Sequence, residues 1–205
     1  MSKRPSARAL AFCATASLLL VLPGCLSDDD DDGRYIIEPP IEELERQSIE
    51  KAIVYLEYTW RHRLYSEYED ILHDQFEYSP LERDAEDFPW MTGSSWSRTE
   101  ELNIAQHMFD PNFTGQENPI DAIEIELTEL SRRNISANHV EVTCTLQGRV
   151  LTATNDGWSF DTRVLIEIVP DPDQPGLFQV IKQTEVDAVL RVDPMSWGSL
   201  KSLYR

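Results

Sequence analysis

The sequence predicts an α+β domain, with its helices in the first half and its strands in the second. Between residues 41 and 109, apolar side chains recur every three or four positions, which is the period of an amphipathic helix. From residue 123 onward, apolar and polar side chains alternate, which is typical of half-buried strands. We therefore expect N-terminal helices that pack on one face of an antiparallel meander.

The length of 205 residues is that of one domain and a targeting segment, and 41% of the residues are hydrophobic, which is enough for a core. We divide the chain into a signal peptide at 1–24, an acidic tether at 25–40 and a single α+β domain at 41–205. The sequence shows no internal repeat and no second globular domain.

Residues 1–24 have the three parts of an export signal: a basic start, an apolar run from Ala9 to Leu22, and a small residue, Gly24. A helix that crosses a bilayer needs about 20 apolar residues. The apolar run is shorter than that and ends at Pro23, so we predict a cleaved signal in preference to a permanent transmembrane anchor.

The segment Leu22-Pro23-Gly24-Cys25 resembles the lipobox of bacterial lipoproteins, although Pro23 departs from the small or aliphatic residue that is usual there. The resemblance implies that Cys25 becomes the first residue and is acylated with diacylglycerol and a further chain such as palmitate. Each buried methylene contributes about 0.8 kcal/mol, so two or three chains hold a protein on a bilayer. An ordinary secretory signal that ends in an unmodified cysteine is the alternative.

The resemblance further implies an exported protein that is lipid-anchored to the cell envelope. Leu26 follows the cysteine, which is similar to the pattern that is not retained in the inner membrane, so the outer membrane is favoured. Asp28 to Asp32 form a repelling, hydrated run that predicts an extended tether up to Pro39. Cys144 is then the one cysteine left in the folded domain, which excludes an intrachain disulfide, and we predict that it is a small buried hydrophobe.

Helical spacing predicts a long first helix over 41–63. Ser66-x-x-Glu69 has the pattern of a capping box and predicts a second helix that ends near Phe76. Ser97-x-x-Glu100 repeats the pattern and predicts a third helix that Pro111 ends. We expect residues 78–93, which contain two prolines, to form a loop with at most a short strand.

Period-two alternation predicts strands at 123–127 and 140–147, and two more near 160–169 and 177–190. The connections carry the turn signals RNISAN, TNDGW and PDPDQPG. Four strands in sequence with short links predict a meandering antiparallel sheet.

The helical segment YLEYTWRHRLYSEYEDILHDQFEYSP, the third helix that ends in His-Met-Phe, and the meander that follows resemble the nuclear transport factor 2-like, or SnoaL-like, superfamily. The resemblance covers about residues 41–190 and implies a cone in which a curved sheet wraps around the helices and leaves a pocket at the wide end. Members include isomerases, dehydratases and cyclases as well as binding and assembly domains, so the fold does not decide the function.

The formal net charge is −19. Residues 1–24 contribute three basic residues and no acid, so the segment from Cys25 onward carries −22. Such a field repels phosphate backbones, which argues against a nucleic-acid partner and is compatible with a cationic one. The sequence has no phosphate-binding glycine loop, no zinc motif and no serine-histidine-aspartate ordering, and we expect neither a metal nor another cofactor.

Enzymes of this fold use a carboxylate or histidine in the pocket as a general acid or base. His107 is the strongest candidate because the third helix places it beside Met108, and Asp70 or Asp110 is its candidate partner. Three tryptophans are candidates to line the pocket together with His107: Trp60, Trp90 and Trp96.

Two functions are therefore open. The first is a non-catalytic envelope lipoprotein whose domain binds a small ligand or an envelope protein. The second is a tethered pocket enzyme of the isomerase, dehydratase or hydrolase type. A homodimer through the exposed sheet face is a further expectation from the resemblance. The two functions differ in whether His107 and an acid meet in a deep cavity or side chains fill the cone.

Overall fold

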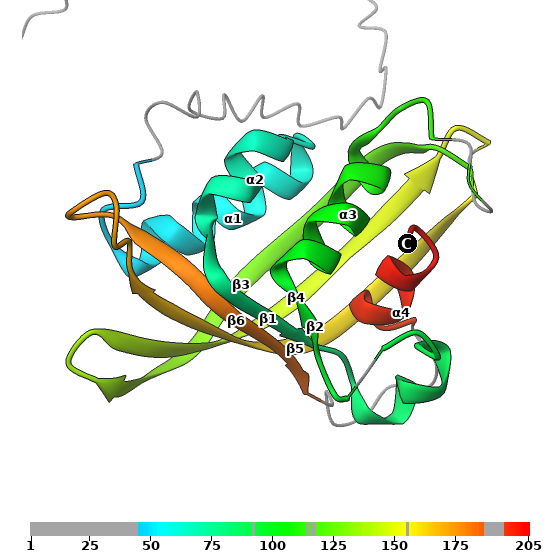
Figure 1. Ribbon diagram of the computed structural model, residues 1–205. Helices are drawn as coiled ribbons and strands as arrows, with labels where there is room; N and C mark the ends of the chain where they lie inside the picture. The colour runs from blue at the N-terminus through cyan, green and yellow to red at the C-terminus, as the bar shows by residue number, and fades with distance from the viewer. Residues whose placement is uncertain (1–44, 92, 114, 116–117, 155, 187–194) are drawn as a thin grey trace, which may run out of the picture. The chain divides into compact units, whose positions relative to one another are not determined.

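A computed structural model describes residues 45–205, except for 92, 114, 116–117, 155 and 187–194 (Figure 1). The predicted signal peptide, Cys25 and the acidic tether lie outside the described residues. Figure 1 shows the sheet curving beneath the helices, and the elements run in chain order as follows: α1 (Ile49–Arg61), α2 (Tyr65–Ile71), β1 (Leu72–Ser79), the 3-10 helix η2 (Glu82–Asp87), β2 (Trp96–Ser97), α3 (Arg98–Phe109), β3 (Ile120–Ser136), β4 (His139–Thr152), β5 (Gly157–Pro170), β6 (Phe178–Val186) and α4 (Trp197–Ser202).

The six strands form one sheet in the order β2-β1-β6-β5-β4-β3. The four strands from β3 to β6 are the predicted antiparallel meander, and they are longer than the alternation alone indicated. Residues 187–190 of the last predicted strand lie outside the described residues. Because β1 joins β6 in parallel, the sheet is mixed. The predicted α+β class is confirmed.

The first two helices begin and end at positions other than those predicted. α1 begins at Ile49, because the Ser48 side chain accepts a hydrogen bond from the Lys51 N–H and caps the helix there. The capping box predicted at Ser66 is wrong: α2 begins at Tyr65, and its N-cap, Leu64, makes no side-chain hydrogen bond.

The predicted continuation of α2 to Phe76 is also wrong, because Leu72–Ser79 forms β1. β1 lies between β2 and β6, so its backbone groups bond to neighbouring strands. Phe76 and Tyr78 alternate with exposed Glu77 and enter the core. Tertiary pairing thus overrides the local helix preference of this acidic segment.

The third helix forms as predicted. The Ser97 side chain accepts from the Glu100 N–H, and Glu100 Oε2 accepts from the Ser97 N–H at 2.8 Å, which completes a capping box. α3 ends at Phe109, one residue before its C-cap and two before Pro111.

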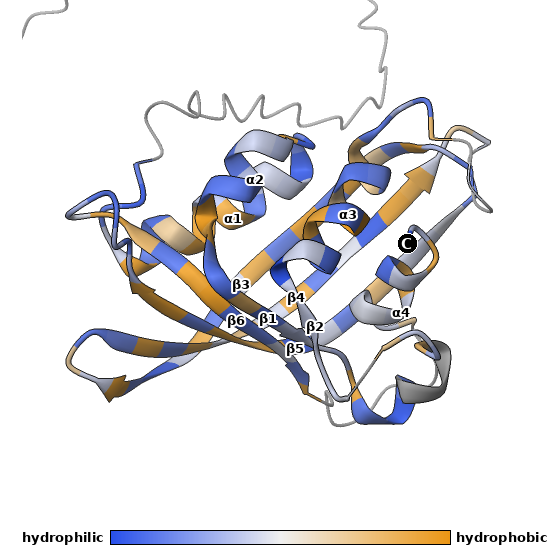
Figure 2. Ribbon diagram, viewed as in Figure 1, coloured by the Kyte–Doolittle hydropathy of each residue, from blue (hydrophilic) through white to orange (hydrophobic). Residues whose placement is uncertain are grey.

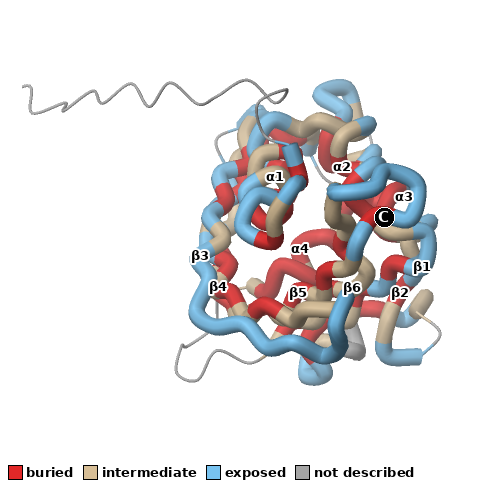
Figure 3. The backbone as a smooth tube through the Cα atoms, turned by 90° about the vertical axis from the view of Figure 1, so that its left-hand side faces the viewer, coloured by how far each residue is buried: buried red, intermediate tan, exposed pale blue. Residues whose placement is uncertain are grey.

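The core lies between the curved sheet and the helices. Figure 2 shows apolar residues alternating with polar ones along the strands, and Figure 3 shows buried segments gathered around α4 at the centre of the domain. Cys144 on β4 is fully buried and free, as predicted, and burial raises the pKa of its thiol to about 12. In the described part of the chain, no helix is both long enough and apolar enough to cross a membrane.

Arg46 joins three parts of the fold that are distant in sequence. Its side chain is buried, its Nη1 donates to the carbonyls of Asp70 and Phe178 at 3.1 Å, and its Nη2 lies 2.5 Å from the Asp70 carboxylate. The buried Asp171 carboxylate lies 3.5 Å away on the turn between β5 and β6. One guanidinium therefore fixes the start of α1, the end of α2 and the start of β6.

We predict that Arg46→Met lowers the free energy of unfolding by about 3 kcal/mol, because it leaves the Asp171 carboxylate buried without its counter-ion. Urea titration followed by circular dichroism measures the loss. Arg61→Met is the matched control, since Arg61 is exposed at the end of α1, and its i,i+4 pair with Glu57 contributes at most about 0.5 kcal/mol. Equal losses in the two variants would contradict the assigned role of Arg46.

Candidate functional site

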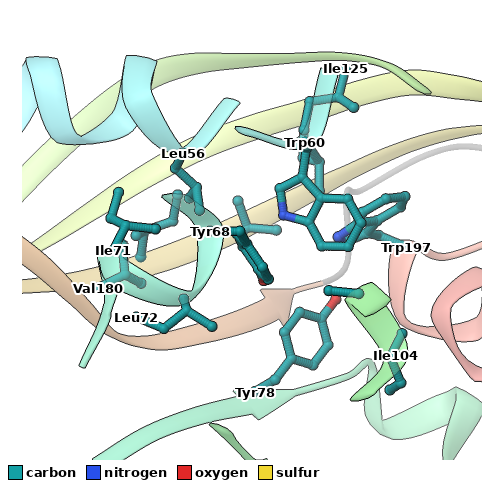
Figure 4. Close-up of a cluster of buried hydrophobic side chains, with 14 of the residues drawn as sticks. Leu56, Trp60, Tyr68, Ile71, Leu72, Tyr78, Ile104, Ile125, Val180 and Trp197 are labelled. Atoms are coloured by element: carbon teal, nitrogen blue, oxygen red, sulfur yellow. The ribbon is translucent and has the colours of Figure 1, made fainter. Parts of the chain in front are cut away.

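The space enclosed by the curved sheet is filled with aromatic side chains from four elements. Trp60 of α1, Tyr68 of α2, Tyr78 of β1 and Trp197 of α4 converge there, as Figure 4 shows. The centroid of the Trp60 ring lies 4.9 Å from that of the Tyr68 ring and 4.8 Å from that of the Trp197 ring, and both pairs have edge-on geometry. Edge-on aromatic pairs of this kind are favourable beyond the area that they bury.

Glu101 of α3 is the acceptor at the centre of this aromatic cluster. Its carboxylate accepts hydrogen bonds from the Tyr68 hydroxyl and, at 2.8 Å, from the Trp96 indole N–H. Lys201 Nζ of α4 lies 2.5 Å from Glu101 Oε1, and both side chains are 0% exposed. The carboxylate is thus held by three donors from three elements, and its position is fixed.

Lys201 Nζ also lies over three aromatic rings. The distances from Nζ to the ring centroids are 4.0 Å for Tyr78, 5.1 Å for Trp60 and 5.3 Å for Trp197. Burial lowers the pKa of Lys201, and the carboxylate of Glu101 opposes that shift. We call Trp60, Tyr78, Trp197 and Glu101 together the Lys201 cage.

A second buried carboxylate, Glu185 of β6, binds the start of α4. Both of its oxygens lie 3.2 Å from the Gly198 N–H, which donates to them. Gly198 permits this approach, because a Cβ there would lie 2.9 Å from Glu185 Oε2 and from Pro80 Cβ. Burial raises the pKa of Glu185 to about 7, although the Gly198 N–H and the charge of Lys201 act in the opposite direction.

Among the described residues, a cavity of about 10 Å³ lies inside the sheet, close to the volume that one water molecule requires. Two polar atoms in its lining, the Tyr78 hydroxyl and Gln183 Oε1, are buried and make no hydrogen bond to the described residues. The cavity is lined by Leu56, Trp60, Tyr78, Ile125, Leu127, Leu146, Val164, Gln183 and Trp197.

The residues predicted to catalyse do not meet in this space. His107 is half-buried, its Nδ1 lies 2.7 Å from the Tyr204 carbonyl oxygen, and its ring stacks on Phe113 at 4.8 Å. Asp110 is the exposed C-cap of α3 and accepts from the Asn112 N–H at 2.8 Å. Asp70 pairs with Arg46 at the end of α2. His107 thus holds the C-terminal segment, and each carboxylate has a structural partner.

The three tryptophans predicted to line the pocket lie in different parts of the domain. Trp60 and Trp96 are each 2% exposed; Trp60 lines the small cavity, and Trp96 bonds to Glu101 and stacks on Tyr78 at 4.3 Å. Trp90 is half-buried near the surface, and the Arg205 guanidinium lies 4.0 Å from its ring centroid.

Sequence reasoning missed Glu101, Glu185 and Lys201. A signal for α4 exists, since Trp197, Leu200 and Tyr204 recur at helical spacing after Ser196, which caps the helix by accepting from the Ser199 N–H. No local pattern indicates that a lysine within this segment is fully buried.

A further hollow, of about 750 Å³, is open to solvent where α1 meets β3 and β4. It contains Glu57, Glu124, Glu126 and Arg61 without a histidine or cysteine. Among the described residues, no three histidine, cysteine or acidic side chains are placed to hold a metal ion.

The arrangement of helices and curved sheet described above also occurs in solved structures. A candidate aromatic ring hydroxylase from Novosphingobium aromaticivorans superposes with a TM-score of 0.55 at 9% identity, covering 77% of this chain and 96% of that one. An NTF2-like protein of unknown function in nutrient uptake from Rhodospirillum rubrum superposes with a TM-score of 0.50 at 8% identity, covering 69% of this chain and 99% of that one. The domain has the NTF2-like fold.

A second NTF2-like neighbour, a candidate scytalone dehydratase from Novosphingobium aromaticivorans, gives a TM-score of 0.52 at 9% identity and covers 76% of this chain and 92% of that one. No protein-family model and no curated protein sequence matches the chain. At these identities the NTF2-like likeness extends to the fold alone, and the side chains inside the cone are this chain's own.

We predict that Glu185→Gln changes the pH dependence of stability. Because the folded pKa of Glu185, about 7, lies above the ordinary 4.5, the folded state holds this proton more tightly than the unfolded state. The contribution of this group to the free energy of unfolding of the wild type therefore falls by up to about 3 kcal/mol as pH rises from 4.5 through 7. The variant lacks that loss, so its stability relative to the wild type rises over the same range.

Urea denaturation of both proteins between pH 4.5 and 8 measures the difference. Glu124→Gln is a control whose difference from the wild type stays nearly constant over this range, because the hydrogen bond from Arg149 holds the pKa of that exposed carboxyl below its usual value and its titration falls below pH 4.5. A constant difference between Glu185→Gln and the wild type would show that Glu185 is not perturbed by burial.

Proposed function

We propose that the protein is a lipid-anchored envelope protein whose NTF2-like domain binds a ligand or partner and does not catalyse a reaction. The filled cone carries the proposal: the space where an NTF2-like enzyme would hold its substrate contains the Lys201 cage and a cavity of about 10 Å³. A small organic substrate requires a pocket of roughly 300 Å³ or more.

The alternative is a pocket enzyme. It is favoured by the names of two neighbours of this fold, a candidate scytalone dehydratase and a hexachlorocyclohexane dehydrochlorinase. Such chemistry needs a base within hydrogen-bond reach of a bound substrate. His107 is bonded to the Tyr204 carbonyl, and Asp70 and Asp110 are bonded elsewhere, so the described contacts favour the binding function.

The proposed anchor rests on residues 1–40 of the sequence. The Leu22-Pro23-Gly24-Cys25 motif follows an apolar run, and the acidic stretch after it is suited to hold the domain away from anionic head groups. The proposed partners are thus the bilayer, through acylated Cys25, and a small ligand or envelope protein at the domain; a second copy against the sheet face is also proposed.

We expect Cys25→Ser to move the protein from the membrane fraction to the soluble fraction when the full chain is expressed in a bacterium. The membrane-bound share falls about tenfold or more, because the variant lacks the thiol that carries the acyl chains. Fractionation with a carbonate wash measures the share, and mass spectrometry of the N-terminal peptide detects the acyl chains. Cys144→Ala is the matched control and stays membrane-bound. A Cys25→Ser protein that resists the wash would refute the anchor.

We expect the interior tryptophans to be shielded from a small polar quencher. In a Trp90→Phe/Trp158→Phe variant, the remaining tryptophans are Trp60, Trp96 and Trp197, each at most 3% exposed. Acrylamide then quenches their fluorescence several-fold less than that of free tryptophan. Quenching close to the free value would indicate an open pocket and favour the enzyme.

A further inference from the structure

The Lys201 cage has the chemistry of an ammonium-binding site. An ammonium group over the faces of several aromatic rings is attracted by their quadrupoles, and a carboxylate adds a charge-assisted hydrogen bond. Here the rings come from α1, β1 and α4, at 4.0–5.3 Å from Lys201 Nζ, and Glu101 of α3 lies 2.5 Å from it.

Three members of the cage, Trp60, Tyr78 and Glu101, are held by contacts other than those to Lys201, whereas Trp197 belongs to α4, the helix that carries Lys201. Tyr68 and Trp96 donate to Glu101 and hold its carboxylate in place, and Trp96 stacks on Tyr78. Trp60 is fixed by edge-on contacts to Tyr68 and to Phe109, at 4.9 Å each. These contacts do not involve Lys201, so Trp60, Tyr78 and Glu101 stay arranged when the ammonium leaves.

Core filling does not explain a lysine at this position. Apolar residues in place of both Lys201 and Glu101 would occupy similar volume without the cost of removing two charges from water, and such replacements of whole buried ion pairs are often neutral or stabilising. The surroundings favour cations further, because Glu185 adds a second buried carboxylate near Lys201 and the whole chain carries −19.

We propose that the interior of the cone is a recognition site for a primary ammonium group on an unbranched alkyl chain, which the protein fills with its own Lys201. An external alkylammonium ligand occupies the part of this site that Trp60, Tyr78 and Glu101 form when α4 withdraws together with Trp197. This inference rests on the proposed function, since it names the ligand class of a domain that binds and does not transform.

The first experiment empties the site. Lys201→Ala removes three carbons and the nitrogen, which are the heavy atoms of n-propylammonium. We expect 100 mM n-propylammonium to raise the Tm of this variant by about 5 °C, as mass action predicts for a ligand well above its Kd. The neutral isostere 1-propanol at the same concentration gives less than about 1 °C.

Two variants control this result. Lys201→Met fills the cage with an apolar chain, so we expect n-propylammonium to leave the Tm of this variant unchanged. Any change in its Tm reports an effect of ionic strength. Lys201→Ala/Glu101→Gln lacks the carboxylate and loses most of the shift. A shift of equal size with 1-propanol, or in either control, would reduce the site to a nonspecific cavity and overturn the proposal.

If Lys201→Ala does not fold alone, the readout becomes refolding. Near-ultraviolet circular dichroism of the buried tryptophans then recovers when n-propylammonium is present and not when 1-propanol replaces it. Failure to recover with n-propylammonium, or equal recovery with 1-propanol, would overturn the proposal.

The second experiment tests the exchange in the wild type. Hydrogen exchange of the peptide at 195–205 reports α4, in which the Leu200 N–H donates to the Ser196 carbonyl at 3.0 Å. We expect n-propylammonium to accelerate this exchange several-fold and 1-propanol to leave it unchanged. No acceleration at a concentration that saturates Lys201→Ala would show that Lys201 is a permanent core residue. Neither experiment depends on membrane anchoring, so a negative Cys25→Ser result leaves this test intact.

Discussion

The ion pair between Glu101 and Lys201 is the interaction on which the interior of the domain depends. It joins α3 to α4 through two side chains that are 0% exposed, 100 residues apart in sequence. Removing either partner leaves a buried charge uncompensated, which costs several kcal/mol in proteins generally. The pair therefore determines both where α4 sits and how much space remains inside the cone.

The polar atoms around this pair are satisfied to different degrees. Glu101 has three donors, whereas the Tyr78 hydroxyl and Gln183 Oε1 have no hydrogen bond to described residues. Buried polar networks of this kind are costly when incomplete and specific when complete. Glu185, with a pKa raised to about 7, adds a group whose charge changes near neutral pH beside the same helix. The interior is thus a polar site enclosed by aromatic rings, which differs from an ordinary apolar core.

The sequence predicted what depends on local chemistry and periodicity. The Ser97 capping box, the four strands of the meander and the burial of Cys144 follow from spacing along the chain. The same capping pattern at Ser66 failed, because α2 begins at Tyr65 and Ser66 lies within the helix. The predicted continuation of α2 failed because the pairing of β1 with β6 decides the conformation of the residues after Ile71. The site depends on contacts across the whole chain. Nothing near Lys201 in sequence indicates that Glu101 neutralises it, and His107 was favoured by neighbours that do not determine its partner.

The NTF2-like fold places a space between a curved sheet and its helices, and the side chains that enter this space decide its use. In an enzyme the space must stay open to a substrate and present a base to it. Here a helix of the same chain delivers a cation into that space together with one aromatic ring, and a carboxylate and two aromatic rings of other elements receive it. A site that binds an ammonium group so completely has already satisfied its carboxylate. Three donors occupy three of the four lone-pair directions of the Glu101 carboxylate while Lys201 remains bound, and its side chain is 0% exposed, so occupancy by α4 keeps Glu101 out of reach of a substrate that would need it as a base.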